Sequence, residues 1–320
     1  MRWARMAVML GVGLFPQLAV ADAYPSKMIR FIVGFPAGNT IDVISRIVID
    51  DVRERTGAVI VIENRPGGLG AIGIQAVMAS APDGYTLGPS STATHSVGPY
   101  VLRALENLKP VESLTHVALV TRFDFGVVVN SKSPFKTIQD IASASVKAPQ
   151  GVNYGYGTAT SQAAGSGFAL ATGIKGTSVP YKGTPPAITD LLGGQIEFVA
   201  ADLGALVAHV QSGALRPLAL LSEKRSAILP DVPTAKELGY GDVFFRGWVG
   251  FDGPRGLPDE VIQWWSEQFK VSLAKPPVQQ RLLNIGMETT PVFGADFNNF
   301  VVAEQRRWAE QVAKAGIQIE

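Results

Sequence analysis

Short apolar segments alternate with segments of helical pattern along most of this chain of 320 residues. In the stretch 41–55, for example, Ile41, Ile44 and Val48 fall on one face of a helix. Strands that alternate with helices in this way pair in parallel, because each helix carries the chain back across the sheet. The alternation therefore predicts an α/β fold.

The alternation runs through two successive series. The predicted strands are 29–33, 59–62, 85–87, 117–120, 125–129, 152–154, 178–180, 196–200, 217–221 and 244–251. The predicted helices are 41–55, 71–79, 97–105, 138–144, 163–171, 186–192 and 203–211, with three more that begin near Pro258, Pro277 and Ala295. Two series and a helical C-terminal tail predict two Rossmann-like lobes. We expect residues 24–123 plus 245–320 to form lobe 1 and residues 124–244 to form lobe 2. The chain should cross between them near 122–125 and 244–248, with the ligand cleft between the lobes.

The first 23 residues, MRWARMAVMLGVGLFPQLAVADA, have the order of a secretory signal peptide. Arg2 and Arg5 supply a positive head, residues 6–15 are apolar, and Ala21-Asp22-Ala23 offers a small-x-small cleavage site. The apolar stretch is shorter than the roughly 20 residues that a membrane-spanning helix needs. We expect cleavage after Ala23 and export to the periplasm.

Length, cysteine content and charge limit what the exported part can be. Removing 23 of the 320 residues leaves 297, close to the limit of about 250–300 at which one core splits into two. Cysteine is absent, so core burial must hold the fold together without disulfides. The signal peptide carries two arginines and one aspartate of the 28 basic and 27 acidic residues, which leaves 26 of each. This balance argues against nucleic acid and anionic membranes as partners and favours a small molecule.

Gly68, Gly70 and Gly73 in VIVIENRPGGLGAIG have the spacing of a dinucleotide-binding loop. A functional loop of this kind follows the first strand, and an acid about 20 residues later binds the ribose. Here the glycines follow the second predicted strand, and the next strand runs into Gly88-Pro89-Ser90, where no acid stands. We therefore interpret the glycines as a tight turn and a close-packed helix start, and we expect no dinucleotide and no other cofactor.

Signals for catalysis and metal binding are sparse. The histidines are His95, His116 and His209, without the paired spacing of a zinc site, and there is no G-x-S-x-G or P-loop sequence. His116 and His209 are interpreted as structural, whereas His95 lies in a polar loop that could border a cleft. We predict no metal site and no catalytic residues, although a triad assembled from distant positions stays open.

Five segments are similar to one protein family: 24–38, 61–73, 81–87, 179–197 and 224–234. With them, the chain from Tyr24 onward resembles the periplasmic substrate-binding receptors of tripartite tricarboxylate transporters, the Bug or TctC-like family. The resemblance implies a periplasmic-binding-protein fold of the Venus-flytrap type that closes on a small organic carboxylate. It also implies delivery to the large and small membrane subunits of a transporter, without catalysis. We expect a monomer.

The loop FPAGNTID precedes the helix predicted at 41–55 and is the first candidate site. The first backbone N–H groups of a helix lack intrahelical partners, and the helix dipole favours an anion there. The family loop reads roughly P-A-G-G-G/S-T-D, so here Asn39 replaces a glycine and Ile41 a threonine. Asn39 and Asp42 have the spacing of a capping box, and Asp42 either caps the helix or binds an amine or hydroxyl of the ligand. The candidate ligand-binding residues are Pro36, Ala37, Gly38, Asn39, Thr40 and Asp42.

The resemblance places a second loop at 156–162, where Gln162 replaces a usual histidine. Tyr156 either stacks on the ligand or packs at a strand end, and the hydroxyl groups that follow either donate to a carboxylate or cap a helix. Thr92 and Thr94 follow the third predicted strand and should face the crevice. Asp202 either binds the ligand or caps the next helix. The further candidate ligand-binding residues are Thr92, Thr94, Tyr156, Gly157, Thr158, Thr160, Ser161 and Asp202.

These features favour an extracytoplasmic receptor for a carboxylate. A ligand sensor of the same fold, which signals to a membrane partner, is one alternative. An exported hydrolase or oxidoreductase is the alternative from a different class. The ligand itself is not predicted.

Overall fold

The computed structural model describes residues 24–241 and 243–314. The predicted signal peptide at 1–23 lies outside the described residues. Within the described ranges, none of the helices has both the length and the apolar character that a membrane crossing requires.

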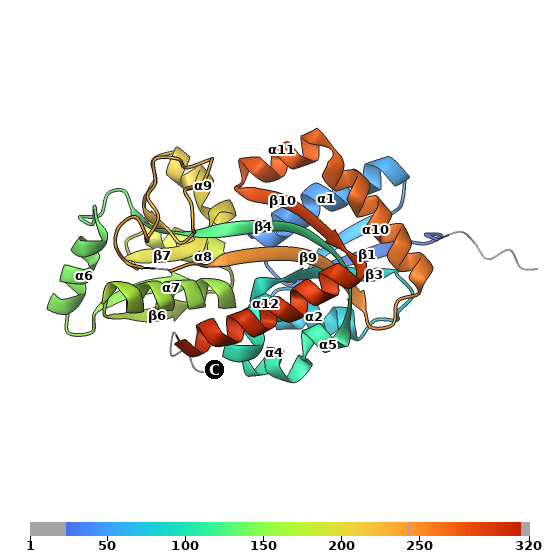
Figure 1. The fold of residues 1–320 in the computed structure, drawn as a ribbon, viewed down its shortest axis with the longest axis horizontal. Coiled ribbons are helices and arrows are strands. Elements are labelled where there is room, and N and C mark those ends of the chain that lie inside the picture. Colours follow the sequence, from blue (N-terminus) through green and yellow to red (C-terminus); the bar gives the residue numbers. More distant parts are fainter. Residues whose placement is uncertain (1–23, 242, 315–320) are drawn as a thin grey trace, which may run out of the picture.

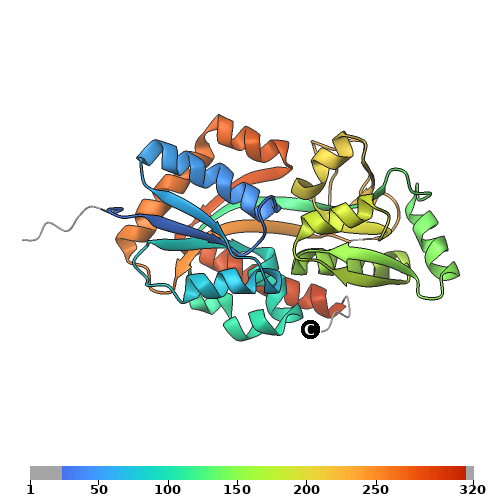
Figure 2. The same cartoon turned by 180° about the vertical axis from the view of Figure 1, so that it is seen from behind.

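The chain forms two α/β lobes that are joined by two long strands (Figures 1 and 2). In lobe 1 the strands pair in parallel in the order β2 (Ile60–Asn64), β1 (Ile29–Val33), β3 (Thr86–Ser91). In lobe 2 the order is β6 (Gly176–Pro180), β5 (Val152–Tyr156), β7 (Phe198–Asp202), again in parallel. The predicted α/β fold with two Rossmann-like lobes is confirmed.

The strands that join the lobes are β4 (Leu114–Asn130) and β9 (Arg246–Pro254), which pair antiparallel. The partner of β4 changes along its length: β9 up to Asp124, then β7 and β8 from Phe125 onward. The prediction of two short strands separated by TRFD is wrong, because these four residues continue the ladder with β9, and the first three of them also pair with β10. The change of partner falls within the predicted crossing at 122–125, while the residue boundaries of the lobes stay a prediction.

Two further strands pair antiparallel with β4, namely β8 (Leu215–Leu220) and β10 (Met287–Phe293), the second of which was not predicted. The helices are α1 (Thr40–Thr56), α2 (Ala71–Met78), α3 (Gly98–Val101), α4 (Arg103–Leu108), α5 (Pro110–Ser113), α6 (Ile138–Lys147), α7 (Ala159–Thr172), α8 (Thr184–Leu192), α9 (Leu203–Gln211), α10 (Asp259–Ala274), α11 (Pro276–Asn284) and α12 (Gly294–Lys314). A 3-10 turn, η1 (Gly68–Gly70), precedes α2, and a π-helical turn, η2 (Thr92–Val97), follows β3.

The C-terminal helices α10 and α11 return to lobe 1 and pack against α1 (Figure 1). Ser272 and Lys275 at the end of α10 bond to Asp51 of α1 at 2.6 and 2.7 Å. The predicted apolar face of α1 is buried in the core, with Ile44 and Val48 both fully covered. The helical tail therefore completes the first lobe.

The glycines before and within the first turn of α2 allow close packing, as predicted. An ideal Cβ on Gly73 would lie 2.3 Å from the Cα of Gly34, and one on Gly70 would lie 2.7 Å from Thr94 Cγ2. Contacts this short leave room only for hydrogen atoms. Glycine here allows the start of α2 to pack directly on the backbone at the end of β1.

Candidate functional site

A cavity of about 260 Å³ lies where the loop before α1 meets lobe 2. Its wall combines residues 34–36 and 66–70 of lobe 1 with Gly157 and residues 180–183 of lobe 2. A Cβ on Gly183 would approach Pro36 Cδ to 3.2 Å, so the lobes are close together here. Both predicted loops therefore border one cavity.

Asn39 is the N-cap of α1, and its side-chain oxygen accepts a hydrogen bond from the Ile41 N–H at 3.0 Å. The predicted capping box is wrong in detail, because Asp42 accepts from the N–H of Gly38 instead of the N–H of Asn39. The amide nitrogen Nδ2 of Asn39 is buried and has no hydrogen-bond partner among the described residues. A buried donor without a partner is costly unless a ligand or water satisfies it.

The Asp42 side chain forms hydrogen bonds that hold the loop before α1. Its carboxylate accepts from Gly38 N–H at 2.9 Å, from Asn64 Nδ2 at 2.8 Å and from Arg46 Nε at 3.0 Å. Burial acts to raise the pKa of Asp42, but the hydrogen bonds from Arg46, Asn64 and Gly38 outweigh it and the pKa is lowered. Its predicted role at the helix terminus is therefore seen in these bonds, and its contact with a ligand stays a prediction.

Thr40 and Asp202 join the two lobes. The Thr40 hydroxyl donates to Asp202 Oδ1 at 2.6 Å, and the same oxygen accepts from the Ala205 N–H at 3.0 Å. Asp202 thus caps α9, as one of its two predicted roles required. Burial raises the pKa of Asp202, although the hydrogen bond from Thr40 opposes that shift. This pair places the start of α1 directly against the start of α9.

The second predicted loop caps α7. Thr158 is the N-cap, its hydroxyl oxygen accepts from Ser161 N–H at 3.0 Å, and Ser161 Oγ accepts from the N–H groups of Gly157 and Thr158. The capping alternative is therefore seen for these hydroxyls. Thr160, by contrast, is 2% exposed, and its hydroxyl has no partner among the described residues.

Sequence reasoning missed Thr184, the first residue of α8. Its hydroxyl is also buried without a partner in the described part of the chain. A Cβ on Gly157 would lie 2.0 Å from the carbonyl carbon of Gly183, so the starts of α7 and α8 touch. The sequence signal is Gly183-Thr184-Pro185-Pro186, which places a hydroxyl at a helix start. Three adjacent helix starts thus carry unsatisfied buried groups: Asn39, Thr160 and Thr184.

The remaining predicted residues differ in burial. Thr92 and Thr94 are buried in η2: Thr92 Oγ1 accepts from Trp248 N–H at 2.7 Å, and Thr94 Oγ1 lies 2.9 Å from His95 Nδ1. Tyr156 ends β5 and is 2% exposed. Ala37 and Gly38 are exposed at the tip of the first loop. Direct ligand contact of all these residues stays a prediction.

A second, larger cavity of about 580 Å³ is lined by parts of both lobes, including Phe123 and Asp124 of β4 and Arg246 of β9. Burial raises the pKa of Asp124 to about 6, although Arg246, whose Nε lies 3.8 Å from the carboxylate, lowers it. A carboxyl that resists ionisation therefore lies at the crossing between the lobes.

Replacing Asp124 with asparagine should change how stability depends on pH. Between about pH 4 and pH 6 the unfolded chain releases this proton while the folded chain keeps it, so wild-type stability falls as the pH rises. The variant lacks this loss, so between pH 4 and pH 7 its free energy of unfolding should rise relative to that of wild type by up to about 3 kcal/mol. Urea unfolding of both chains from pH 4 to 7 measures this difference. A difference that does not change with pH would contradict the assignment.

The chain is similar to known proteins in sequence and in fold. The sequence model of one protein family, the tripartite tricarboxylate transporter family receptor, matches residues 44–317 of this chain. Among curated relatives, protein BugT of Bordetella pertussis is 33% identical over 312 residues, which cover 94% of this chain and 93% of BugT.

Solved structures show the same fold. The periplasmic binding protein BugD superposes with a TM-score of 0.86 at 27% identity, covering 93% of this chain and 100% of BugD. R. palustris Rpa4515 with adipate superposes with a TM-score of 0.88 at 28% identity, covering 93% of this chain and 100% of Rpa4515. MatC (Rpa3494) from Rhodopseudomonas palustris with bound malate superposes with a TM-score of 0.83 at 25% identity, covering 90% of this chain and 100% of MatC. Two of these relatives thus hold a dicarboxylate.

Proposed function

Because the chain belongs to the tripartite tricarboxylate transporter receptor family, we propose that it binds a small organic carboxylate and delivers it to the large and small membrane subunits of such a transporter. The family consists of periplasmic substrate-binding receptors, which implies a periplasmic location. We propose that the segment 1–23 directs export. The chain acts by binding and release, without chemical conversion of its ligand.

The observation that carries this proposal is the group of unsatisfied polar side chains at adjacent helix starts. Asn39 Nδ2 and the hydroxyls of Thr160 and Thr184 are buried without a partner among the described residues. These groups can all donate hydrogen bonds, and the helix dipoles favour negative charge at the same place. A carboxylate is acceptor-only and would satisfy several of them at once.

Two relatives also support a carboxylate as the ligand, since Rpa4515 is solved with adipate and MatC with malate. We propose that one carboxylate is held between residues 36–40 and 156–161, with the rest of the molecule extending between the lobes. We further propose that the lobes, divided near 123/124 and 244/245, close on the ligand. Closure expels water and strengthens each hydrogen bond to the charge.

A thermal-shift screen tests this function. Ligand at 100 times its Kd stabilises the fold by about 2.7 kcal/mol, which for a chain of this size raises Tm by about 4 °C. We expect such a shift with particular dicarboxylates among mono-, di- and tricarboxylates, aromatic acids and acidic amino acids. NMR of the incubated ligand should show it unchanged. No shift with any carboxylate, or consumption of the compound, would overturn the proposal.

A further inference from the structure

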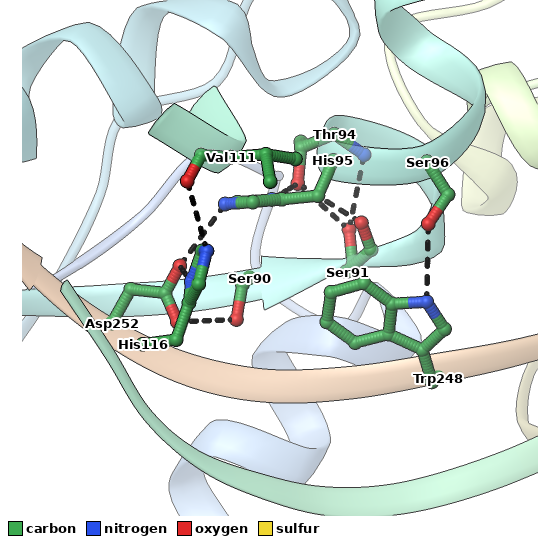
Figure 3. Close-up of polar contacts among 9 residues, drawn as sticks. All are labelled: Ser90, Ser91, Thr94, His95, Ser96, Val111, His116, Trp248 and Asp252. Carbon is green, nitrogen blue, oxygen red and sulfur yellow. Dashed lines mark hydrogen bonds and ion pairs between the residues drawn. The ribbon is translucent and has the colours of Figure 1, made fainter. Parts of the chain in front are cut away.

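His95, His116 and Asp252 form a buried cluster that the proposed function does not use. They come from three elements, η2, β4 and β9, and their exposed fractions are 0%, 6% and 1%. His116 and Asp252 stand directly opposite each other on the paired strands, and His95 reaches them from η2 (Figure 3). The tertiary structure thus joins two histidines whose sequence spacing argued against a metal site.

Each of the three residues has one nitrogen or oxygen atom that can bind a metal, and these three atoms lie close together. Asp252 Oδ2 lies 2.8 Å from His116 Nδ1 and 3.0 Å from His95 Nε2. The three atoms all lie within 4.8 Å of one another. Among the described residues, His95 Nε2 has no aligned hydrogen bond, and its polar contact is the ion pair with Asp252 Oδ2. Two imidazole nitrogens thus share one carboxylate oxygen, an arrangement that a metal ion between the three atoms can also satisfy.

The opposite side of each group is held by a hydrogen bond. His116 Nε2 lies 3.1 Å from the carbonyl oxygen of Val111, His95 Nδ1 lies 2.9 Å from Thr94 Oγ1, and Ser90 Oγ donates to Asp252 Oδ1 at 2.8 Å (Figure 3). Metal-bound histidines characteristically donate their second ring N–H to a carbonyl or hydroxyl oxygen, which fixes the ring. In each residue, one polar atom therefore faces the other two residues, and the other polar atom is held by a neighbouring group.

We propose that His95 Nε2, His116 Nδ1 and Asp252 Oδ2 bind one divalent transition-metal ion, with Zn²⁺ the ion that this donor set suits best. Two imidazole nitrogens and one carboxylate oxygen are regular zinc ligands, and a water molecule completes the tetrahedron. Bonds of 2.0–2.2 Å place tetrahedral ligands about 3.3–3.6 Å apart, so Asp252 Oδ2 moves away from each imidazole nitrogen by roughly half an ångström when the ion enters. The ion ties η2 to the strands that join the lobes.

Because the cluster is buried, the ion enters while the chain folds, and the test must include that step. The mature chain is unfolded in guanidinium chloride with EDTA and then refolded by dialysis, either with two equivalents of ZnCl₂ or with EDTA. We expect about one zinc ion per chain after gel filtration, measured by elemental analysis, and a Tm several degrees above that of the EDTA-refolded chain. Chain refolded with Co²⁺ should show the visible absorption of a tetrahedral ion.

Variants separate this site from adventitious binding. Asp252→Asn keeps the side-chain shape and should lower retained zinc from about one ion per chain to background, and it should abolish the Tm difference between the two refolding conditions. His209→Gln, in α9 outside the cluster, should retain zinc like wild type. Equal Tm with and without zinc, and no zinc retained by wild type, would show a metal-free histidine–carboxylate pair and overturn the proposal. Zinc retained equally by Asp252→Asn would overturn it as well.

Discussion

Replacing Gly73 with alanine should destabilise the folded chain by about 3 kcal/mol, which is at the upper end of the usual cost of overpacking. The added methyl carbon would lie 2.3 Å from the Cα and 2.7 Å from the nitrogen of Gly34. Both atoms belong to backbone at the end of β1, and a Cβ on Gly34 would itself approach the Gly70 carbonyl oxygen to 2.7 Å. No side chain can rotate away to make room, so α2 must move off the sheet. Urea unfolding monitored by circular dichroism measures the loss.

Gly193→Ala is the matched control, because Gly193 has an ordinary backbone conformation of φ −78° and the nearest atom to its Cβ is 3.4 Å away. This change should alter stability by less than about 0.5 kcal/mol. If Gly73→Ala proved as mild as the control, close packing would not be the reason for glycine in this loop. The resemblance of Gly68, Gly70 and Gly73 to a dinucleotide loop would then need another explanation.

Replacing Asn39 with aspartate should weaken binding of the best carboxylate by about 100-fold or more. The substitution keeps the oxygen that accepts from Ile41 N–H, and it exchanges the buried, unpartnered Nδ2 donor for a second negative oxygen. The ligand then loses a charged hydrogen bond and meets a like charge, and 100-fold corresponds to about 2.8 kcal/mol. Isothermal titration calorimetry with the best compound from the screen gives the affinity.

Aspartate is as good an N-cap as asparagine and suits the helix dipole, which offsets part of the cost of burying a charge at this 2% exposed position. The Tm without ligand is measured as well, and affinity is compared only for chain that circular dichroism shows to be folded. Asn299→Asp makes the same chemical change on an exposed part of α12 and should leave affinity unchanged. Unaltered affinity of Asn39→Asp would show that the start of α1 does not hold the carboxylate.

The family resemblance and the two-lobed α/β fold could be predicted because both depend on local patterns. Ile44 and Val48 lie on the apolar face of α1, and both are buried. The predicted starts of the C-terminal helices agree with α10, α11 and α12 within one or two residues. The helix predicted from residue 41 begins at Thr40, after the N-cap Asn39. The helix predicted from residue 163 begins four residues earlier, at Ala159, after the N-cap Thr158.

Where local pattern and long-range pairing disagreed, the prediction failed. Thr121, Arg122 and Asp124 resemble a loop, yet they extend β4 because β9 and β10 lie on either side to accept their backbone hydrogen bonds. His95 was expected at a cleft, but it is fully buried beside Asp252, which is 157 positions away in the sequence. The residues near His95 in the sequence do not predict that Asp252 lies beside it.

The order of elements, the glycine turns and the capped helix starts follow from the sequence alone, because each depends on residues within about one turn or one strand. Which helix starts come together was decided only by the tertiary structure. Thr40 meets Asp202 and Pro36 meets Gly183 because β4 and β9 hold the two lobes face to face. The same crossing brings His116 against Asp252. Side chains separated by more than a hundred residues become neighbours through strand register, and register depends on the whole sheet rather than on any one segment.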